Sequence, residues 1–224
     1  NKDIGFYVFS LPVLQAGLGL AKTLVILALA GCASIYFLRG SLYVASLRVL
    51  KQIQIDRAAQ IHLGILLAIF LGTIAAGVYL SRFTLLTSQG GLVFGATYTD
   101  VTVKILMLWI SMATAVLAVV SAVFWAWKGK LSLLIGAVSL YVVAGLAGAV
   151  VPFLVQKLIV APNELVKETP FIKYNIAATR QAFALDKIEE REISGDKPIT
   201  AADISANNLT VKNVRLWDRK PLLS

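Results

Sequence analysis

The sequence predicts a mainly α-helical, polytopic membrane protein with four spans and the start of an extracytoplasmic α/β tail. Hydrophobic residues make up 58% of the 224 residues and charged residues only 15%, whereas soluble domains carry about 25% charged residues. Residues 131–155 contain no charge, and a helix needs only about 20 apolar residues to cross the bilayer core. The composition turns polar after residue 155. We therefore expect a membrane region, residues 21–155, followed by residues 156–224 as the start of an extracytoplasmic domain.

The first apolar stretch, residues 4–38, contains one charge, Lys22, and is longer than a single span requires. Pro12 favours a break within it. Aromatic residues gather before this proline, and aromatic rings settle at the membrane–water interface. We therefore expect residues 1–20 to form an interfacial aromatic segment. The first span is then residues 21–38, with the Lys22 ammonium reaching the polar edge of the membrane.

Residues 39–60 connect the first two spans and carry four basic residues and one acidic residue. Apolar residues recur at helical spacing, which is typical of an amphipathic helix lying on an anionic membrane surface. They are Leu42, Ala45, Val49 and Ile53. A plain solvated connector is an equally weighted alternative.

The second span, residues 61–80, carries four small residues spaced four apart: Gly64, Ala68, Gly72 and Ala76. This spacing keeps them on one helical face, where small side chains let a second helix approach closely. We interpret them as a helix-packing face. The alternative is that glycine and alanine are simply common in membrane spans.

The third and fourth spans, residues 104–127 and 131–155, are joined by the short basic turn 128–130 and are therefore expected to be antiparallel neighbours. Basic residues concentrate in cytoplasmic loops. The 39–60 connection holds four and the 128–130 turn two, against one in residues 81–103. Residues 39–60 and 128–130 are accordingly predicted to be cytoplasmic, and the tail extracytoplasmic.

The tail shows two helix-start signals and one strand-like segment. Thr169 before Pro170 resembles a helix N-cap, and Thr200 with Asp203 resembles a capping box. Residues 211–217 have β-prone character. Because 69 residues without a disulfide or metal pattern make a marginal domain, we expect the apolar faces of the tail to pack against chain beyond residue 224 or against another subunit.

Candidate site residues are few. Asp100, with Tyr98 beside it, can cap the third span through the helix dipole, and a ligand or ion contact is the sharper alternative. His62, the single histidine, is interpreted as an interfacial polar residue, and Cys32 as a small buried one. We predict no catalytic, cofactor-binding or metal-binding residue, and no enzymatic activity, because no nucleophile lies in a pattern with a base. The basic residues flank the spans, so they do not indicate nucleic-acid binding.

Six segments carry a family resemblance: residues 3–12, 93–100, 161–165, 179–183, 213–218 and 221–223. Together they resemble Uncharacterised Protein Family 0182, large multi-pass membrane proteins of bacteria. The resemblance covers nearly the whole chain and implies further spans before residue 1, a large extracytoplasmic region after residue 224 and a bacterial cell membrane location. It implies no activity.

Two functions remain open from the sequence. In the first, the spans anchor an extracytoplasmic domain that engages a partner or assembly, in contact with lipid and with other subunits or the rest of a longer chain. In the second, the chain is a subunit of a transporter or channel. The first is favoured because no ionisable residue falls in the middle of a predicted span, where ion pathways are usually marked by charge.

Overall fold

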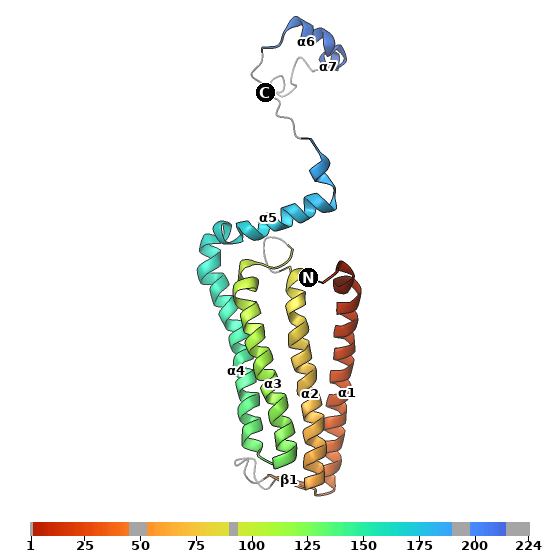
Figure 1. The fold of residues 1–224 in the computed structure, drawn as a ribbon, viewed down its shortest axis with the longest axis vertical. Coiled ribbons are helices and arrows are strands. Elements are labelled where there is room, and N and C mark those ends of the chain that lie inside the picture. The colour runs from red at the N-terminus through yellow and green to blue at the C-terminus, as the bar shows by residue number, and fades with distance from the viewer. Residues whose placement is uncertain (1, 45–52, 90–93, 190–197, 214–224) are drawn as a thin grey trace, which may run out of the picture. The chain divides into compact units, whose positions relative to one another are not determined.

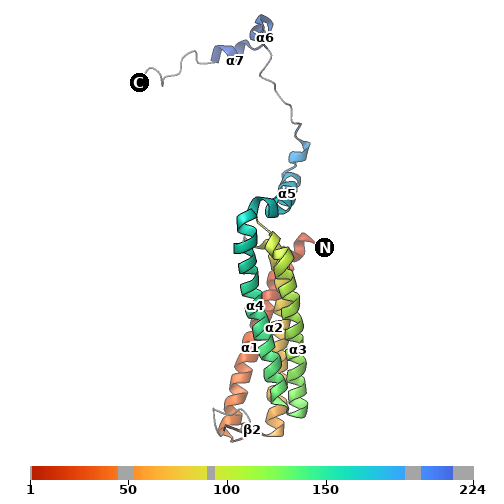
Figure 2. The ribbon, with the colours of Figure 1, turned by 90° about the vertical axis from the view of Figure 1, so that its left-hand side faces the viewer.

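The computed structural model describes residues 2–44, 53–89, 94–189 and 198–213. Residues 1–179 and 180–224 form two separate units. Of the described residues, those in the first unit build a bundle of long antiparallel helices that run side by side (Figures 1 and 2). The helices of this bundle are α1 (Leu11–Leu38), α2 (Arg57–Thr84), α3 (Ile105–Lys128) and α4 (Leu131–Val155). They are followed by α5 (Glu164–Ala182) and, in the second unit, by α6 (Ala201–Ala206) and α7 (Asn208–Asn213).

Four helices in the described part of the chain are long and apolar enough to cross a membrane, as predicted. With the irregular turns that extend them, they cover Phe6–Leu38, Arg57–Thr87, Asp100–Lys128 and Leu131–Ala182. The packed core is made largely of small and aliphatic side chains where α2, α3 and α4 meet, among them Leu71, Ala118, Ala122 and Ala137. Large apolar side chains such as Leu27 and Val143 are exposed instead. A bundle that is apolar outside and tightly packed inside suits a lipid environment.

The first helix is longer than predicted. A π-helical turn, Phe6–Ser10, leads directly into α1, so one continuous helix replaces the expected interfacial segment 1–20 and the span 21–38. Pro12 does not break it, because the wider π turn makes room for the proline ring where a regular turn would clash. As a result, Lys22 lies in the middle of the helix, with 16 residues on each side, and not at its edge.

The connection between α1 and α2 is a β-hairpin in its described parts, and the predicted amphipathic helix over residues 39–60 is wrong there. Strands β1 (Leu42–Val44) and β2 (Ile53–Ile55) pair antiparallel, and residues 45–52 lie outside the described part of the chain. Gly40, with φ +73°, ends the helical path after α1. β-branched residues then favour the extended backbone, and the Asp56 amide donates to the Ser41 carbonyl at 3.0 Å. We call this part of the bundle the hairpin end.

The C-terminus of α3 is also at the hairpin end, and side chains from the first turn of α2 cap it. The Arg57 guanidinium donates to the Ala126 and Trp127 carbonyls, and the Gln60 amide donates to the Trp125 carbonyl at 2.6 Å. The Ala126 and Trp127 carbonyls lie in the last turn, where the helix has no amide left for them, and the Trp125 carbonyl also accepts from the Gly129 amide at 2.9 Å. The side-chain contacts therefore fasten α2 to α3. Gly129, with φ +73°, then turns the chain into α4.

The predicted α/β tail is not supported, because the described tail residues are helical. α4 continues through a π turn (Gln156–Val160) and a 3₁₀ turn (Ala161–Asn163) into α5. The helix begins at Glu164 and not at Thr169, whose hydroxyl donates to the Leu165 carbonyl instead of capping. Pro170 is tolerated inside α5 because the carbonyl it leaves unpaired belongs to Val166, an exposed residue.

In the second unit, one sequence signal is confirmed and one is wrong. The Thr200–Asp203 capping box forms and opens α6. Residues 211–213 of the β-prone segment lie in α7, and residues 214–217 lie outside the described part of the chain.

Candidate functional site

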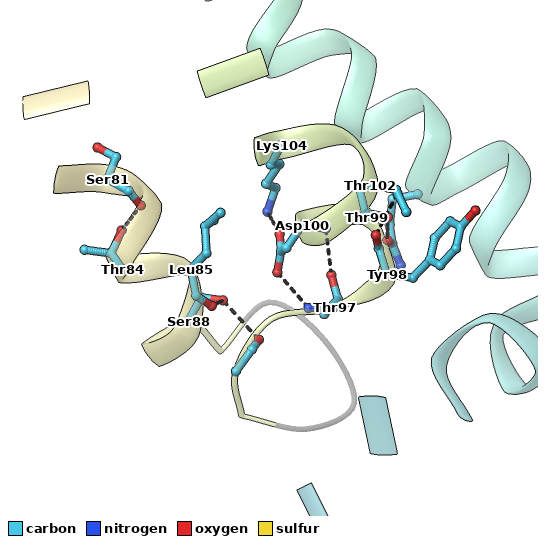
Figure 3. Close-up of polar contacts among 12 residues, drawn as sticks. Ser81, Thr84, Leu85, Ser88, Thr97, Tyr98, Thr99, Asp100, Thr102 and Lys104 are labelled. Carbon is cyan, nitrogen blue, oxygen red and sulfur yellow. Dashed lines mark hydrogen bonds and ion pairs between the residues drawn. The ribbon is translucent and has the colours of Figure 1, made fainter. Parts of the chain in front are cut away.

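A network of polar side-chain contacts lies where the start of the third span meets the bend between α4 and α5 (Figure 3). We call it the α5 junction and define it by Phe94, Thr97–Asp100, Lys104, Gln156, Glu168 and Asn175. The segments that form it are far apart in sequence, so the junction depends on the folded bundle. The end of the bundle that carries it is the α5 end.

The third span begins with a capping box. Its first helical residue is Tyr98, so Thr97 is the N-cap and Asp100 the third helical position. The Asp100 carboxylate accepts from the Thr97 amide at 3.0 Å, and the Thr97 hydroxyl accepts from the Asp100 amide at 3.3 Å. The pair thereby satisfies two amides that the helix itself leaves unpaired, and Asp100 adds a negative charge where the helix dipole favours one.

Asp100 also forms an ion pair along the helix. Its second carboxylate oxygen lies 2.6 Å from the Lys104 ammonium, one turn on. The Asp100 side chain is 1% exposed and the Lys104 side chain 42%, so the pair connects a buried carboxylate to a cation that still reaches the surface. Both oxygens of Asp100 are therefore engaged (Figure 3).

Glu168 from α5 completes the cap. Its carboxylate is 4% exposed, and both of its oxygens accept from the Tyr98 amide at 3.2 Å. A residue on one helix thus satisfies the first free amide of another. Because losing this acceptor would leave the partly buried Tyr98 amide unsatisfied, the contact is costly to break.

Other contacts across the same junction reinforce it. The Asn175 amide donates to the Phe94 carbonyl at 2.9 Å, and the Thr99 hydroxyl donates to the side-chain carbonyl of Gln156. The Tyr98 ring meets the Phe171 ring edge-on, with 6.5 Å between centroids. The Lys167 ammonium lies 5.0 Å from the centre of the Tyr98 ring. Together these contacts hold α5 against the start of the third span over residues 167–175.

The junction is built to bind and orient chain segments. Its two buried carboxylates are occupied by backbone amides and a lysine, so neither is poised as a general base for a nearby nucleophile. Among residues 2–44, 53–89, 94–189 and 198–213, no group of three or more His, Cys, Asp or Glu side chains could hold a metal ion. A cavity of about 350 Å³ lies beside Lys104, between α2, α3 and α4.

The predicted packing face on α2 divides into two halves. Gly64 lies against Ala126 of α3, so closely that a Cβ placed on Gly64 would lie 2.5 Å from the Ala126 Cβ. Ala68 is also buried. A Cβ on Gly72 would meet no described heavy atom within 4 Å, and Ala76 is only half-buried beside an open groove.

The two other residues considered in the sequence analysis, His62 and Cys32, make contacts between helices of the bundle. The His62 ring nitrogen lies 2.9 Å from the Tyr36 hydroxyl, so it links α1 to α2. Cys32 is half-buried and packs against the core cluster of the bundle.

Comparison with known proteins adds the family. Over residues 1–224 the chain matches the family described as Uncharacterised protein family (UPF0182). The chain belongs to this family. UPF0182 proteins of Pelobacter propionicus, Trichlorobacter lovleyi and Trichodesmium erythraeum are 39%, 40% and 35% identical to it. Each alignment covers the whole of this chain and 24–25% of the relative, so the chain spans about a quarter of the length of these relatives. No solved structure matches.

The family match confirms the resemblance read from the sequence motifs. The structure of this UPF0182 chain adds side-chain contacts that the sequence analysis did not predict. The Thr97–Asp100 pair has the same spacing as the recognised Thr200–Asp203 box, so the sequence did contain its signal. Lys104 lies four residues after Asp100, a spacing at which opposite charges pair on a helix, so this ion pair could also have been predicted from the sequence. Glu168 had no such signal, because it lies 70 residues from Tyr98 in sequence.

Proposed function

We propose that this UPF0182 chain anchors an extracytoplasmic domain in a bacterial cell membrane and fixes the direction in which the chain leaves the membrane. The domain would engage a partner or assembly from that position. The observation that carries the proposal is the contact of the buried Glu168 carboxylate with the Tyr98 amide, which ties α5 to the spanning bundle. α4 runs into α5 without a flexible break, so the direction of α5 follows from the bundle.

The proposed sidedness places the hairpin end in the cytoplasm and the α5 end outside. It is supported by the six basic residues in residues 39–60 and 128–130, against one in residues 81–103. The partners of the chain would be the lipid bilayer and other subunits or further segments of a longer chain. We propose neither nucleic-acid binding nor enzymatic activity.

Sidedness is tested by cysteine labelling in intact cells, after Cys32→Ala removes the native thiol. A cysteine at Ser88 or Asn207 should react with a membrane-impermeant thiol reagent, and one at Gln54 should not. Labelling at Gln54 alone would reverse the proposed orientation.

The orienting role is tested by the distance between spin labels at Leu106 on α3 and Tyr174 on α5, both exposed positions. The wild-type protein should give one narrow distance distribution. Glu168→Ala should broaden it, because the Tyr98 amide loses its acceptor and α5 loses an attachment. Glu164→Ala, on the same helix and outside this contact, is the matched control and should leave the distribution narrow. Equal distributions in wild type and Glu168→Ala would refute the orienting role.

The alternative function, a transporter or channel subunit, is favoured by the position of Lys22 within a spanning helix, since charges there usually mark solute or ion pathways. Under this alternative, proteoliposomes containing the protein should show an ion or solute flux that Lys22→Met abolishes. The absence of such a flux would leave anchoring as the better account.

A further inference from the structure

A second polar region lies within the apolar part of the bundle, around Lys22. A cavity of about 370 Å³ is formed there by α1, α2 and α4. Thr73 and Tyr141 line it from the middle thirds of α2 and α4, and Ser81 lines it from the last turn of α2, so the cavity extends from the middle of the bundle toward the α5 end. Cavities of this size accommodate small organic ligands.

The polar groups around this cavity are arranged to favour an anion. Lys22 supplies a positive charge, and the Gln15 amide and the Tyr141 hydroxyl supply uncharged donors. The hydroxyls of Thr73 and Ser81 donate to carbonyls of their own helix. None of the described residues that line the cavity is acidic, and among the described residues Lys22 forms no ion pair.

An uncompensated lysine in the middle of a spanning helix is costly to place in the bilayer. Lys22 is half-buried and lines the cavity, 16 residues from either end of its helix. A negatively charged occupant would offset this cost through a charge-assisted hydrogen bond.

The remaining lining is apolar and is widened by two glycines. Leu18, Ile74 and Val78 supply aliphatic surface, and Gly19 and Gly77 lie among them. A Cβ on either glycine would meet no described heavy atom within 4 Å, so the missing side chains leave open room. The cavity therefore combines one cationic side chain, Lys22, with a short apolar groove lined by Leu18, Ile74 and Val78, which we call the trough.

We propose that this cavity binds a small organic anion, with its carboxylate on Lys22 and Gln15 and its short apolar body between α1, α2 and α4. This site is distinct from the α5 junction and does not depend on the anchoring function. Charge selects the anion, and the volume limits the length of its apolar part.

The test uses the intact protein in nanodiscs of phosphatidylcholine, whose headgroup has no net charge. Sodium hexanoate is the probe, and hexylammonium chloride and hexanol are controls of the same chain length. Hexanoate should raise the thermal unfolding temperature of the wild type saturably, and neither control should do so. Lys22→Met should weaken the apparent affinity for hexanoate about tenfold or more, and Lys22→Arg should retain it, because only the latter keeps a charged donor.

A second pair of variants keeps the test decisive if Lys22→Met fails to fold. Gly77→Leu places a side chain in the trough without a clash against described atoms, and should abolish the hexanoate response. Gly31→Leu adds the same side chain to open space on α1 outside the cavity, and should preserve the response. An equal hexanoate effect on wild type and Gly77→Leu would mean partition into lipid only and would overturn the proposal. The proposal would also be overturned if the wild type showed no saturable response to hexanoate. This result is expected if an acidic side chain from elsewhere in the protein already pairs with Lys22.

Discussion

Replacing Gly64 by alanine should separate α2 from α3 at the hairpin end of the bundle. The new Cβ would lie 2.5 Å from the Ala126 Cβ, 3.0 Å from the Ala126 Cα and 3.4 Å from its amide nitrogen. Favourable carbon–carbon contacts lie near 3.5–4.0 Å, so the two backbones must move apart by about 1 Å. Overpacking of this kind costs about 1–3 kcal/mol.

Gly72→Ala is the matched control, because the same substitution on the same helix meets no described atom within 4 Å. Both variants gain the higher helix propensity of alanine, worth about 1 kcal/mol, so this gain cancels in their comparison. The free energy of unfolding of Gly64→Ala should therefore be lower than that of Gly72→Ala by about 1–3 kcal/mol.

The assay is equilibrium unfolding of the purified protein in mild detergent by added dodecyl sulfate, followed by circular dichroism. A reciprocal swap, Gly64→Ala with Ala126→Gly, removes the 2.5 Å contact and leaves the 3.0 Å one, so it should recover only part of the loss. Equal stability of the Gly64→Ala and Gly72→Ala variants would refute the close approach of α2 and α3.

Two further predictions concern the capping boxes. Asp100→Ala should lower the free energy of unfolding by about 1–3 kcal/mol, because the buried Thr97 amide loses its acceptor. Asp100→Asn should lower it less, because the asparagine side chain still offers an acceptor. A large functional loss in Asp100→Asn at unchanged stability would indicate a ligand contact instead. The pKa of Asp203 is lowered by hydrogen bonds from the Thr200 hydroxyl and then the Thr200 amide. The capping contribution of Asp203 to α6 should therefore be complete above the ordinary aspartate pKa of about 3.9 and be lost as the pH falls through the lower folded-state value. Exchange of the Thr200 amide, which donates to the Asp203 carboxylate at 3.0 Å, should follow this course, and in Asp203→Asn it should show no such step.

The parts of the fold that were predictable are those encoded by local composition. Four long apolar stretches were enough to place the helices, and the Thr200–Asp203 pair was enough to place the start of α6. The hairpin was missed because residues 39–60 contain apolar residues at helical spacing, whereas Gly40 and the β-branched residues favour a turn and strands. Lys22 was misplaced because Pro12 was interpreted as a break, and the π turn before it was not visible in the sequence.

The candidate site was harder to predict because its decisive contact joins distant segments. Asp100 was recognised as a cap, since that interaction is local. Glu168 contacts Tyr98 only because α4 bends into α5, and no spacing of residues in the sequence predicts this bend. Sequence reasoning therefore located one half of the α5 junction, and the bundle supplied the other half.

The third span connects both ends of the bundle. At its start, Asp100 and Glu168 place negative charge beside the free amides of the helix, and at its end Arg57 places positive charge beside the free carbonyls. Both arrangements match the helix dipole, so each distant element is attracted to the end of the helix that it caps. The attachments differ in kind, because Arg57 belongs to a neighbouring span whereas Glu168 belongs to α5, beyond the bend. A force on the chain after α5 must therefore act on the contacts that α5 makes, Asn175–Phe94 and Glu168–Tyr98, while the caps at the hairpin end keep α2 and α3 together.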